Sequence, residues 1–558
     1  MDKKLKAFLA EIKIVHVLSV WFVVNLVSAS FTLLYSDESY YKLFSQQLSF
    51  GYFDHPPMIA LFIRLGSLIT NNESGVRLVS VIAITSALYF IYRLSDVKNP
   101  VLFMAAIFSV FALNLLGFMA LPDAPLLFFT VLFFVAYRKF LIKEDTKNTI
   151  LLSVIMTALL YSKYHGILVI LFTVISNLKL LKSGKFWIAA FLGILLFTPH
   201  LAWQVKNNFV TLSYHLFERS ASHYKFIVTL EYIFGQILYY GPFTAVFMYL
   251  ALVKYKANDL FDKALAWNIW GLISFFLIST FRGRVEANWT LPVMVPLLII
   301  FMKYSNTRPI FRRRFYFFAT PVIFLILIFR IQMIYPLLKI NILRIDNLRN
   351  EKEFVKEVVS KSYGLPVLTN SYQDAGIISY YSGNFVPSIN LNGRTNQFSL
   401  WHAEDSLRFR KVAFINDYLN EGVSIANQSY KEYKVTVIDS LPIMNDIIIT
   451  AFPLKTKSRI NEEFNIKVQL AAGQPADTYK DCGQFHTRLY SEMYYNDILI
   501  KEVICPLPVD ILLKKYSGEY SFKFISPASR GTFKIILALK TSVLGTWSTG
   551  KVIRLNVY

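Results

Sequence analysis

Two points in one loop of the chain carry residue types that could accept a proton. Asp37 and Glu38 are adjacent and directly follow a long apolar stretch. Asp54 and His55 lie further along, and the two prolines after them restrict their backbone to extended conformations. A carboxylate or an imidazole can act as a general base. The segment from residue 36 to 74 is also long for a connection, so we interpret it as a candidate reaction site.

Three other turns carry carboxylates and cations of the kind that hold an anionic group. Asp123 lies between two prolines in the segment LPDAP, and Lys163 begins the segment KYH. The turn RGRVEANW contributes Arg282, Arg284 and Glu286. Ionisable residues beside membrane-spanning stretches are costly unless they face water or a partner. These residues are therefore functional candidates as well.

Long apolar runs must position these turns. The chain has 558 residues, of which 55% are hydrophobic and 17% charged, and its mean hydropathy is +0.44. A membrane-spanning helix needs about 20 mostly apolar residues. One large soluble helical protein is the alternative, but so many uncharged runs would present no polar face to water. We predict about eleven spans, over residues 14–34, 76–91, 101–118, 124–137, 150–161, 167–178, 186–203, 227–253, 264–281, 289–301 and 315–335.

The loops between these runs divide by charge. If the N-terminus is cytoplasmic, the inner loops carry most of the cations and the outer loops carry the acids, as the positive-inside rule expects. This pattern also accounts for much of the net charge of +22, which on a soluble protein would suggest nucleic-acid binding. The predicted inner cations are Arg93, Lys98, Arg138, Lys139, Lys143, Lys147, Lys179, Lys182, Lys185, Lys254, Lys256, Lys263, Lys303, Arg308, Arg312, Arg313 and Arg314. The predicted outer acids are Asp37, Glu38, Asp54, Asp123, Glu218 and Glu286.

The last 220 residues differ in character from the rest. Residues 339–430 mix charged helical patterns with a short strand, and residues 431–558 contain period-two runs separated by turn residues. We therefore predict a polytopic α-helical membrane protein with a C-terminal extracytoplasmic α/β plus β-sandwich-like region. A carbohydrate-binding or acceptor-docking role and a purely structural cap both fit that region. Cys482 and Cys505 lie in it, either as a disulfide or as free core residues.

The chain resembles the GT-C glycosyltransferases in five segments, which occur in the order DESYY, GYFDHPPM, LPDAPLLFF, SKYHGIL and RVEANWTLP. The resemblance is greatest to the dolichyl-phosphate-mannose protein mannosyltransferase-like and lipid A aminoarabinose transferase-like branch. The segment from residue 371 to 401 is also similar to bacterial members of that branch. The resemblance covers nearly the whole chain up to about Trp401. It implies that residues 1–338 form a GT-C transmembrane domain.

The resemblance implies a function in the cytoplasmic membrane. Such enzymes move a hexosyl or pentosyl group from a polyprenyl-phosphate carrier to a lipid, glycan or protein acceptor on the outer face, usually with inversion. The expected partners are therefore the lipid-linked donor, the acceptor and the membrane, and not nucleic acid. Metal dependence varies within the superfamily and no ligand spacing here is diagnostic, so a divalent metal ion stays open as a cofactor.

The resemblance also suggests roles for the candidate residues. Asp37 matches the family's first-loop acid and would be the base, Glu38 would tune it or bind the acceptor, and Asp123 would position a substrate. Inverting transfer also needs cations for the leaving phosphate. Lys163, Arg284 and Arg282 are the candidates for that role, while Asp54 and His55 could orient substrate or share a metal ion with Glu286.

Each role has a structural rival. Asp37 could be a solvated helix-end acid, Asp123 a helix cap, and the Asp54–His55 segment a proline-rich turn. Lys163 could extend to a lipid headgroup, and Arg284 could simply pair with Glu286. Two other functions also compete: a flippase, polymerase or ligase-like protein of envelope assembly, and a non-catalytic sugar-binding scaffold. The first should show charges buried within the spans or repeated half-domains, and the sequence suggests neither.

Overall fold

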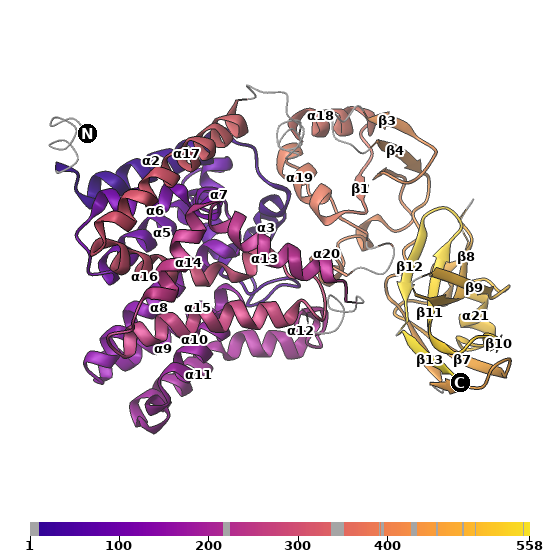
Figure 1. Cartoon of the computed structure of the whole chain (residues 1–558). Helices are drawn as coiled ribbons and strands as arrows, with labels where there is room; N and C mark the ends of the chain where they lie inside the picture. Colours follow the sequence, from indigo (N-terminus) through magenta and orange to yellow (C-terminus); the bar gives the residue numbers. More distant parts are fainter. Residues whose placement is uncertain are drawn as a thin grey trace. The chain divides into compact units, whose positions relative to one another are not determined.

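The computed structural model describes residues 11–215, 224–335, 351–389, 391, 395–425, 432–452, 456–481, 485–496, 498–550 and 552–558. The chain divides into two compact units, Met1–Arg349 and Asn350–Tyr558 (Figure 1). Two residues named above, Glu218 and Cys482, lie outside the described residues.

Unit 1 is a bundle of helices around one large apolar core. Its described elements are α2 (Ile14–Phe31), α3 (Ser36–Gln46), α4 (Met58–Ser67), α5 (Glu73–Leu94), α6 (Pro100–Ser109), α7 (Phe111–Leu116), α8 (Asp123–Ile142), α9 (Thr146–Ser162), α10 (Gly166–Ser176), η1 (Leu178–Lys182), α11 (Gly184–Lys206), α12 (Val210–Ser213), α13 (Phe226–Tyr240), α14 (Thr244–Lys254), α15 (Leu260–Ser279), η3 (Ala287–Val293), α16 (Met294–Asn306) and α17 (Pro309–Ile334).

Seven helices in the described part of unit 1 are long and apolar enough to cross a membrane. They are α2, α5, α8, α11, α15, α17 and the continuous stretch of η3 and α16. Helices α13 and α14 would make an eighth span as a pair, although they are bent by 99° at the break between them. The expected count of about eleven is not confirmed, because the predicted spans 101–118, 150–161 and 167–178 contain the shorter helices α6, α9 and α10, which have 10, 17 and 11 residues. The membrane-protein class itself is confirmed.

The break between α13 and α14 has a local cause. Gly241 ends α13 with a φ of 115°, and Pro242 follows it. A Cβ at Gly241 would lie 2.4 Å from the carbonyl oxygen of Ser109, which leaves room only for glycine. The apolar run 227–253 is therefore two helices and not one straight span.

Helices α5, α8, α15 and α16 run between two ends of the bundle. Asp123 starts α8, and Arg138 lies fifteen residues later, which places it roughly 22 Å along the helix axis. Hydrogen bonds, ion pairs and ring contacts join the corresponding ends of the helices to each other. The residues at the first end include Arg77, Asp123, Arg282 and Asn288, and those at the second end include Asp96, Arg138, Asp262 and Lys303.

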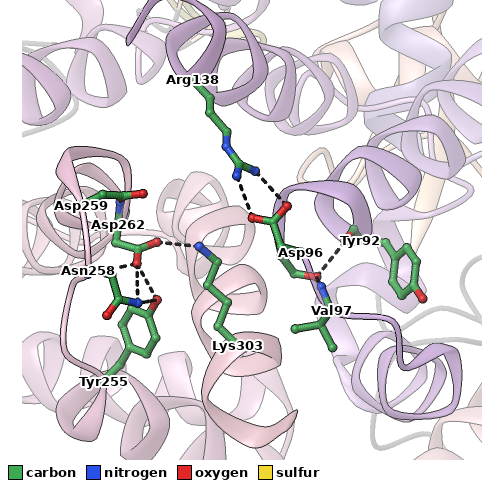
Figure 2. Close-up of polar contacts among 10 residues, drawn as sticks. Tyr92, Asp96, Val97, Arg138, Tyr255, Asn258, Asp259, Asp262 and Lys303 are labelled. Atoms are coloured by element: carbon green, nitrogen blue, oxygen red, sulfur yellow. Dashed lines mark hydrogen bonds and ion pairs between the residues drawn. The ribbon is translucent and has the colours of Figure 1, made fainter. Parts of the chain in front are cut away.

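Figure 2 shows two ion pairs at the second end of the bundle. Arg138 binds Asp96 at 2.7 Å, and Lys303 binds Asp262 at 2.7 Å. The buried ring of Phe261 lies between the two cations, 5.3 Å from Arg138 and 5.8 Å from Lys303. Both cations are among those predicted for the inner loops, so the inner-loop residues Arg138 and Lys303 do gather at one end.

Unit 2 begins with an α/β part. Its described elements are α18 (Glu351–Lys361), β1 (Val367–Thr369), α19 (Tyr372–Ser382), α20 (Gln397–Trp401), η7 (Asp405–Leu407), β2 (Val412–Asn416), β3 (Val423–Ile425) and β4 (Tyr433–Ile438). The strands form a sheet of order β1-β2-β4-β3, in which β1 is parallel to β2 and the other pairs are antiparallel. Helices α18 and α19 pack apolar residues against this sheet.

The rest of unit 2 is rich in antiparallel strands, as the period-two runs predicted. It contains β5 (Ile447–Phe452), β6 (Lys457–Ser458), β7 (Glu463–Ala472), η8 (Ala476–Tyr479), β8 (Thr487–Tyr495), β9 (Ile498–Ile504), α21 (Val509–Lys515), β10 (Glu519–Ile525), β11 (Gly531–Thr541), β12 (Gly545–Thr549) and β13 (Ile553–Val557). One sheet has the order β10-β7-β5, and the other has the order β6-β13-β11-β8-β9 with β12 paired to β11. The two sheets share an apolar core in which Cys505 is buried.

Candidate active site

Helix α3 presents the adjacent acids at its first turn. Asp37 and Glu38 occupy the positions where a carboxylate is stabilised by the partial positive charge of a helix N-terminus. The Glu38 carboxylate also accepts a hydrogen bond from the backbone N–H of Tyr35, at 2.9 Å, which caps the helix. The sequence DESYY thus begins a helix and does not continue the preceding span.

Glu38 is fully buried and bound on both oxygens. Arg77 donates to it from Nε at 2.8 Å and from Nη2 at 2.5 Å, and the backbone N–H of Ala120 donates at 2.7 Å. A bidentate arginine–carboxylate pair is among the strongest ionic hydrogen bonds. Glu38 therefore ties α3 to α5 and to the loop that leads into α8.

Arg77 is equally buried and is completed by the end of α2. Its remaining N–H groups donate to the carbonyl oxygens of Ala29, Thr32 and Leu33, and to the Thr32 hydroxyl, at 2.8–3.2 Å. Sequence analysis missed Arg77. Its only signal was one arginine at the start of the apolar run 76–91, where a charge must have a partner.

Asp37 lies in a different environment from Glu38. Its side chain is only partly buried. Burial raises the pKa of the neighbouring Tyr35 hydroxyl, and the charge of Asp37 raises it further. The carboxylates of Glu286 and Glu38 raise the same pKa, so charges from the first loop and from the turn before η3 act on one phenol.

Asp123 forms the second centre of the site. It is the first residue of α8, it is buried, and it accepts a hydrogen bond from the Nζ of Lys163 at 3.0 Å. Asn288, from η3, donates to its other oxygen at 3.2 Å. Ala120, which binds Glu38, lies three residues before Asp123. The two acid-bearing segments therefore meet at the same end of the bundle.

Asp54 and His55 pack against α3. The Tyr40 hydroxyl donates to the Asp54 carboxylate at 2.9 Å. The ring of His55 lies 5.7 Å from that of Tyr41 and 6.4 Å from that of His215, measured between centroids. Tyr40 and Tyr41 follow the acid pair in α3, so this one helix contacts both predicted points of the first loop.

The turn before η3 is the exposed part of the site. Arg282 is exposed, and the Nε of Arg284 lies 3.9 Å from the Glu286 carboxylate in a largely exposed pair. Such a pair contributes little to stability, which leaves the guanidinium groups accessible to a ligand. Within the described residues, no group of three or more His, Cys, Asp or Glu side chains is placed to hold a metal ion. Asp54, His55 and Glu286 thus form no such group.

A second buried arginine, Arg330, shares the Phe118 ring with Arg77. Arg330, in the span α17, donates to Ser28 at 3.1 Å and Asn25 at 2.9 Å, and it also binds the carbonyl oxygen of Asn114. No carboxylate in the described part of the chain pairs with it. From the sequence we treated the predicted spans 76–91 and 315–335 as uncharged. The structure corrects this, because Arg77 and Arg330 are charged residues that lie buried within these two spans.

Part of the chain matches a known protein family, and the fold of most of the chain matches solved structures. Residues 54–203 match the family described as dolichyl-phosphate-mannose-protein mannosyltransferase. Among solved structures, ArnT from Cupriavidus metallidurans in the apo state superposes with a TM-score of 0.53 at 11% sequence identity, and covers 75% of this chain and 97% of that one. The same protein bound to undecaprenyl phosphate gives a TM-score of 0.51 at the same identity and coverage. No curated protein gives a significant sequence match.

Proposed function

Because this membrane protein has the GT-C fold and part of it matches the mannosyltransferase family, we propose that it is a glycosyltransferase that uses a polyprenyl-phosphate-linked sugar. The similar ArnT was solved with undecaprenyl phosphate, which supports a donor of that class here. The observation that carries the proposal is the joining of Glu38 to Ala120, which brings the Asp37 and Asp123 segments to one end of the bundle.

The contrast between Asp37 and Glu38 supports the assignment of the base. The oxygens of Glu38 are engaged by Arg77, Tyr35 and Ala120, whereas Asp37 is partly exposed in the same helical turn. We infer that Asp37 takes the proton of the acceptor hydroxyl and that Glu38 holds the turn in place. The acceptor oxygen then bonds to the anomeric carbon, and the carbon–oxygen bond to phosphate breaks with inversion.

The other residues divide between donor and acceptor. The leaving phosphate keeps the electron pair of the broken bond, and Arg282 and Arg284, which are exposed, would neutralise its charge. Lys163 is already paired with Asp123, so we assign this pair to substrate positioning. Asp54 and His55 would bind the sugar or its carrier.

We propose that the acid-bearing end faces the extracytoplasmic side of the inner membrane. The ion-pair end carries Arg138 and Lys303 and lies among loops rich in lysine and arginine, which favours the cytoplasmic side. Unit 2 would then lie outside, where a sheet-rich domain could dock the acceptor.

The transport-type alternative gains one observation from the structure. Arg77 and Arg330 are charges within spans, which are typical of carriers. Both, however, are bound by fixed groups of unit 1. If the protein were a carrier, its deletion would leave the cargo on the inner face, and membranes that contain the protein would not transfer sugar from a supplied lipid-linked donor.

The experiment is mass analysis of envelope lipids and glycans from a deletion strain, with membranes of the complemented strain offered a panel of labelled polyprenyl-phosphate sugars. We expect one sugar modification to disappear, its lipid-linked donor to accumulate, and membranes to restore transfer from that donor only. An unchanged set of glycans, with no transfer from any lipid-linked sugar, would contradict the proposal.

A further inference from the structure

The loop that carries Asp54 and His55 is held by its backbone. Three carbonyl oxygens of this loop, at alternate residues, each accept a hydrogen bond from a side chain of α11 or the α12 region. His200 Nδ1 donates to Phe50 at 2.7 Å. Thr211 Oγ1 donates to Tyr52 at 3.2 Å, and His215 Nε2 donates to Asp54 at 3.1 Å. We call His200, Thr211 and His215 the clasp.

The clasped segment is bent, with bends at residues 50, 53, 54 and 55. The backbone N–H of Tyr52 donates to the carbonyl oxygen of His55 at 3.2 Å, which closes a turn, so the segment cannot pair its carbonyl oxygens with a neighbouring strand and takes side-chain donors instead. Gly51 of this segment lies against α11, because a Cβ there would be 2.4 Å from the Trp203 ring. The clasp thus holds a bent segment by its backbone carbonyl oxygens, and the Asp54 and His55 side chains contact α3.

Gln204 and Tyr164 orient the clasp through further hydrogen bonds, and we call this pair the relay. Gln204 donates to the Tyr164 hydroxyl at 2.7 Å and to Thr211 at 3.0 Å. The Tyr164 hydroxyl lies 2.9 Å from His200 Nε2 and can donate to it only if that nitrogen carries no proton. His200 Nδ1 faces a carbonyl oxygen, which only accepts, so Nδ1 must carry a proton. The neutral ring protonated at Nδ1 therefore satisfies the hydrogen bonds of His200 to both Phe50 and Tyr164.

The relay also reaches the other centre of the site. Tyr164 follows Lys163 directly, and Lys163 binds Asp123. Asp54, at the far end of the clasped segment, accepts a hydrogen bond from Tyr40 of α3. The clasp therefore connects the Asp123 segment to the helix that carries Asp37.

We propose that His200, Thr211 and His215 are positioning residues that set the Asp54–His55 segment for the lipid-linked donor. This inference rests on the proposed function and deepens it. Because the clasp acts on ground-state placement of a binding segment, its loss should raise the KM for the donor more than it lowers kcat.

Thr211→Val tests this with the least change of shape. It removes the hydroxyl that binds Tyr52 and leaves the buried carbonyl oxygen unsatisfied. We expect the KM for the labelled polyprenyl-phosphate sugar to rise about tenfold, kcat to stay within about threefold, and Thr211→Ser to restore the wild-type KM. Thr198→Val is the matched control, because the exposed Thr198 hydroxyl binds only a carbonyl of its own helix.

A spin label reports on the clasp without any transfer. Phe50→Cys, with Cys482→Ser and Cys505→Ala, places the label on a side chain that is 59% exposed. We expect Thr211→Val and His200→Phe to increase label mobility and Thr198→Val to leave it unchanged. Unchanged mobility and an unchanged KM in Thr211→Val would overturn the clasp. Increased mobility in a protein that transfers no sugar would support the clasp and overturn the proposed function instead.

Discussion

Two neighbouring carboxylates in α3 show how environment separates roles. Glu38 is fully buried and receives a bidentate arginine, whereas Asp37 is partly exposed beside Tyr35. A buried ion pair is costly to break, because the remaining charge stays in a medium of low polarity. Mutations of the two acids should therefore have different consequences, one mainly for folding and the other mainly for chemistry.

Glu38→Gln should destabilise the protein strongly. The amide cannot neutralise Arg77, so we expect a loss of about 3–5 kcal/mol in stability, measured as thermal unfolding in detergent. The double variant Glu38→Gln/Arg77→Met should recover part of that loss, because it removes the uncompensated charge. The account of Glu38 fails if Glu38→Gln unfolds at the same temperature as Asp37→Asn.

The Asp123–Lys163 pair should be strongly coupled, unlike Arg284–Glu286. The first pair is buried and the second largely exposed. A double-mutant cycle with Asp123→Asn and Lys163→Met should give a coupling of more than about 1 kcal/mol in unfolding free energy. The cycle for Arg284→Met and Glu286→Gln should give less than about 0.5 kcal/mol. Equal couplings would show that burial does not distinguish the pairs.

At the scale of elements, apolar runs predicted where helices occur but not how each one ends. The run 227–253 reads as one span, yet Gly241 and Pro242 divide it into α13 and α14 at 99°. That dipeptide was a visible signal of a break. In unit 2 the alternation of apolar residues predicted strands such as β7, in which Phe464, Ile466 and Val468 are buried.

The candidate residues were predicted from their order along the chain, whereas their partners could not be. Asp123 and Lys163 were both named before the structure brought them together. Arg77 lies 39 residues from Glu38 and Arg330 lies 305 from Asn25, so nothing local indicates that they meet. Such contacts depend on how the helices pack, which one sequence alone does not specify.

Gly241→Ala should disturb the bend between α13 and α14. The positive φ and the close approach to Ser109 both oppose a Cβ, so we expect a loss of about 1–3 kcal/mol in stability. Gly235→Ala is the matched control within α13, since its nearest neighbour would be 3.9 Å away. Helix propensity predicts that this control gains about 0.5–1 kcal/mol. A similar thermal shift in both variants would exclude a special role for the bend.

Glu404→Gln should flatten the pH dependence of unit 2. Burial raises the pKa of Glu404, which accepts a hydrogen bond from Asn445 on one oxygen and lies near Asp405 and His402. Because the folded pKa exceeds the unfolded value of about 4.3, stability is intact below that pH and falls as the pH rises toward the folded pKa.

The measurement is the unfolding temperature of the full chain between pH 4 and pH 8. We expect Glu404→Gln to be more stable than the wild type near pH 8 and equal to it near pH 4. Glu519→Gln, at an exposed position of β10, is the control and should show no such trend. A constant difference between Glu404→Gln and wild type over the whole range would contradict the effect of burial.

For the molecule as a whole, charge divides unit 1 between its two ends. One end holds the ion pairs around Phe261, and the other holds Asp37, Asp123 and the clasped loop. Asp123 and Arg138, at the two ends, are separated by roughly 22 Å along α8, which is most of the thickness of a bilayer core. Chemistry at one end is thus isolated from the loops at the other.

Sugar transfer by Asp37→Asn membranes, with Asp96→Asn as the matched control at the ion-pair end, tests the central claim most directly. Both changes remove one partly exposed carboxylate and keep its shape. With the labelled polyprenyl-phosphate sugar that the wild type uses, we expect Asp37→Asn to lose about 10²–10⁴-fold in kcat and Asp96→Asn to stay within about threefold of wild type. Wild-type transfer by a folded Asp37→Asn protein would contradict the claim that this acid is the base.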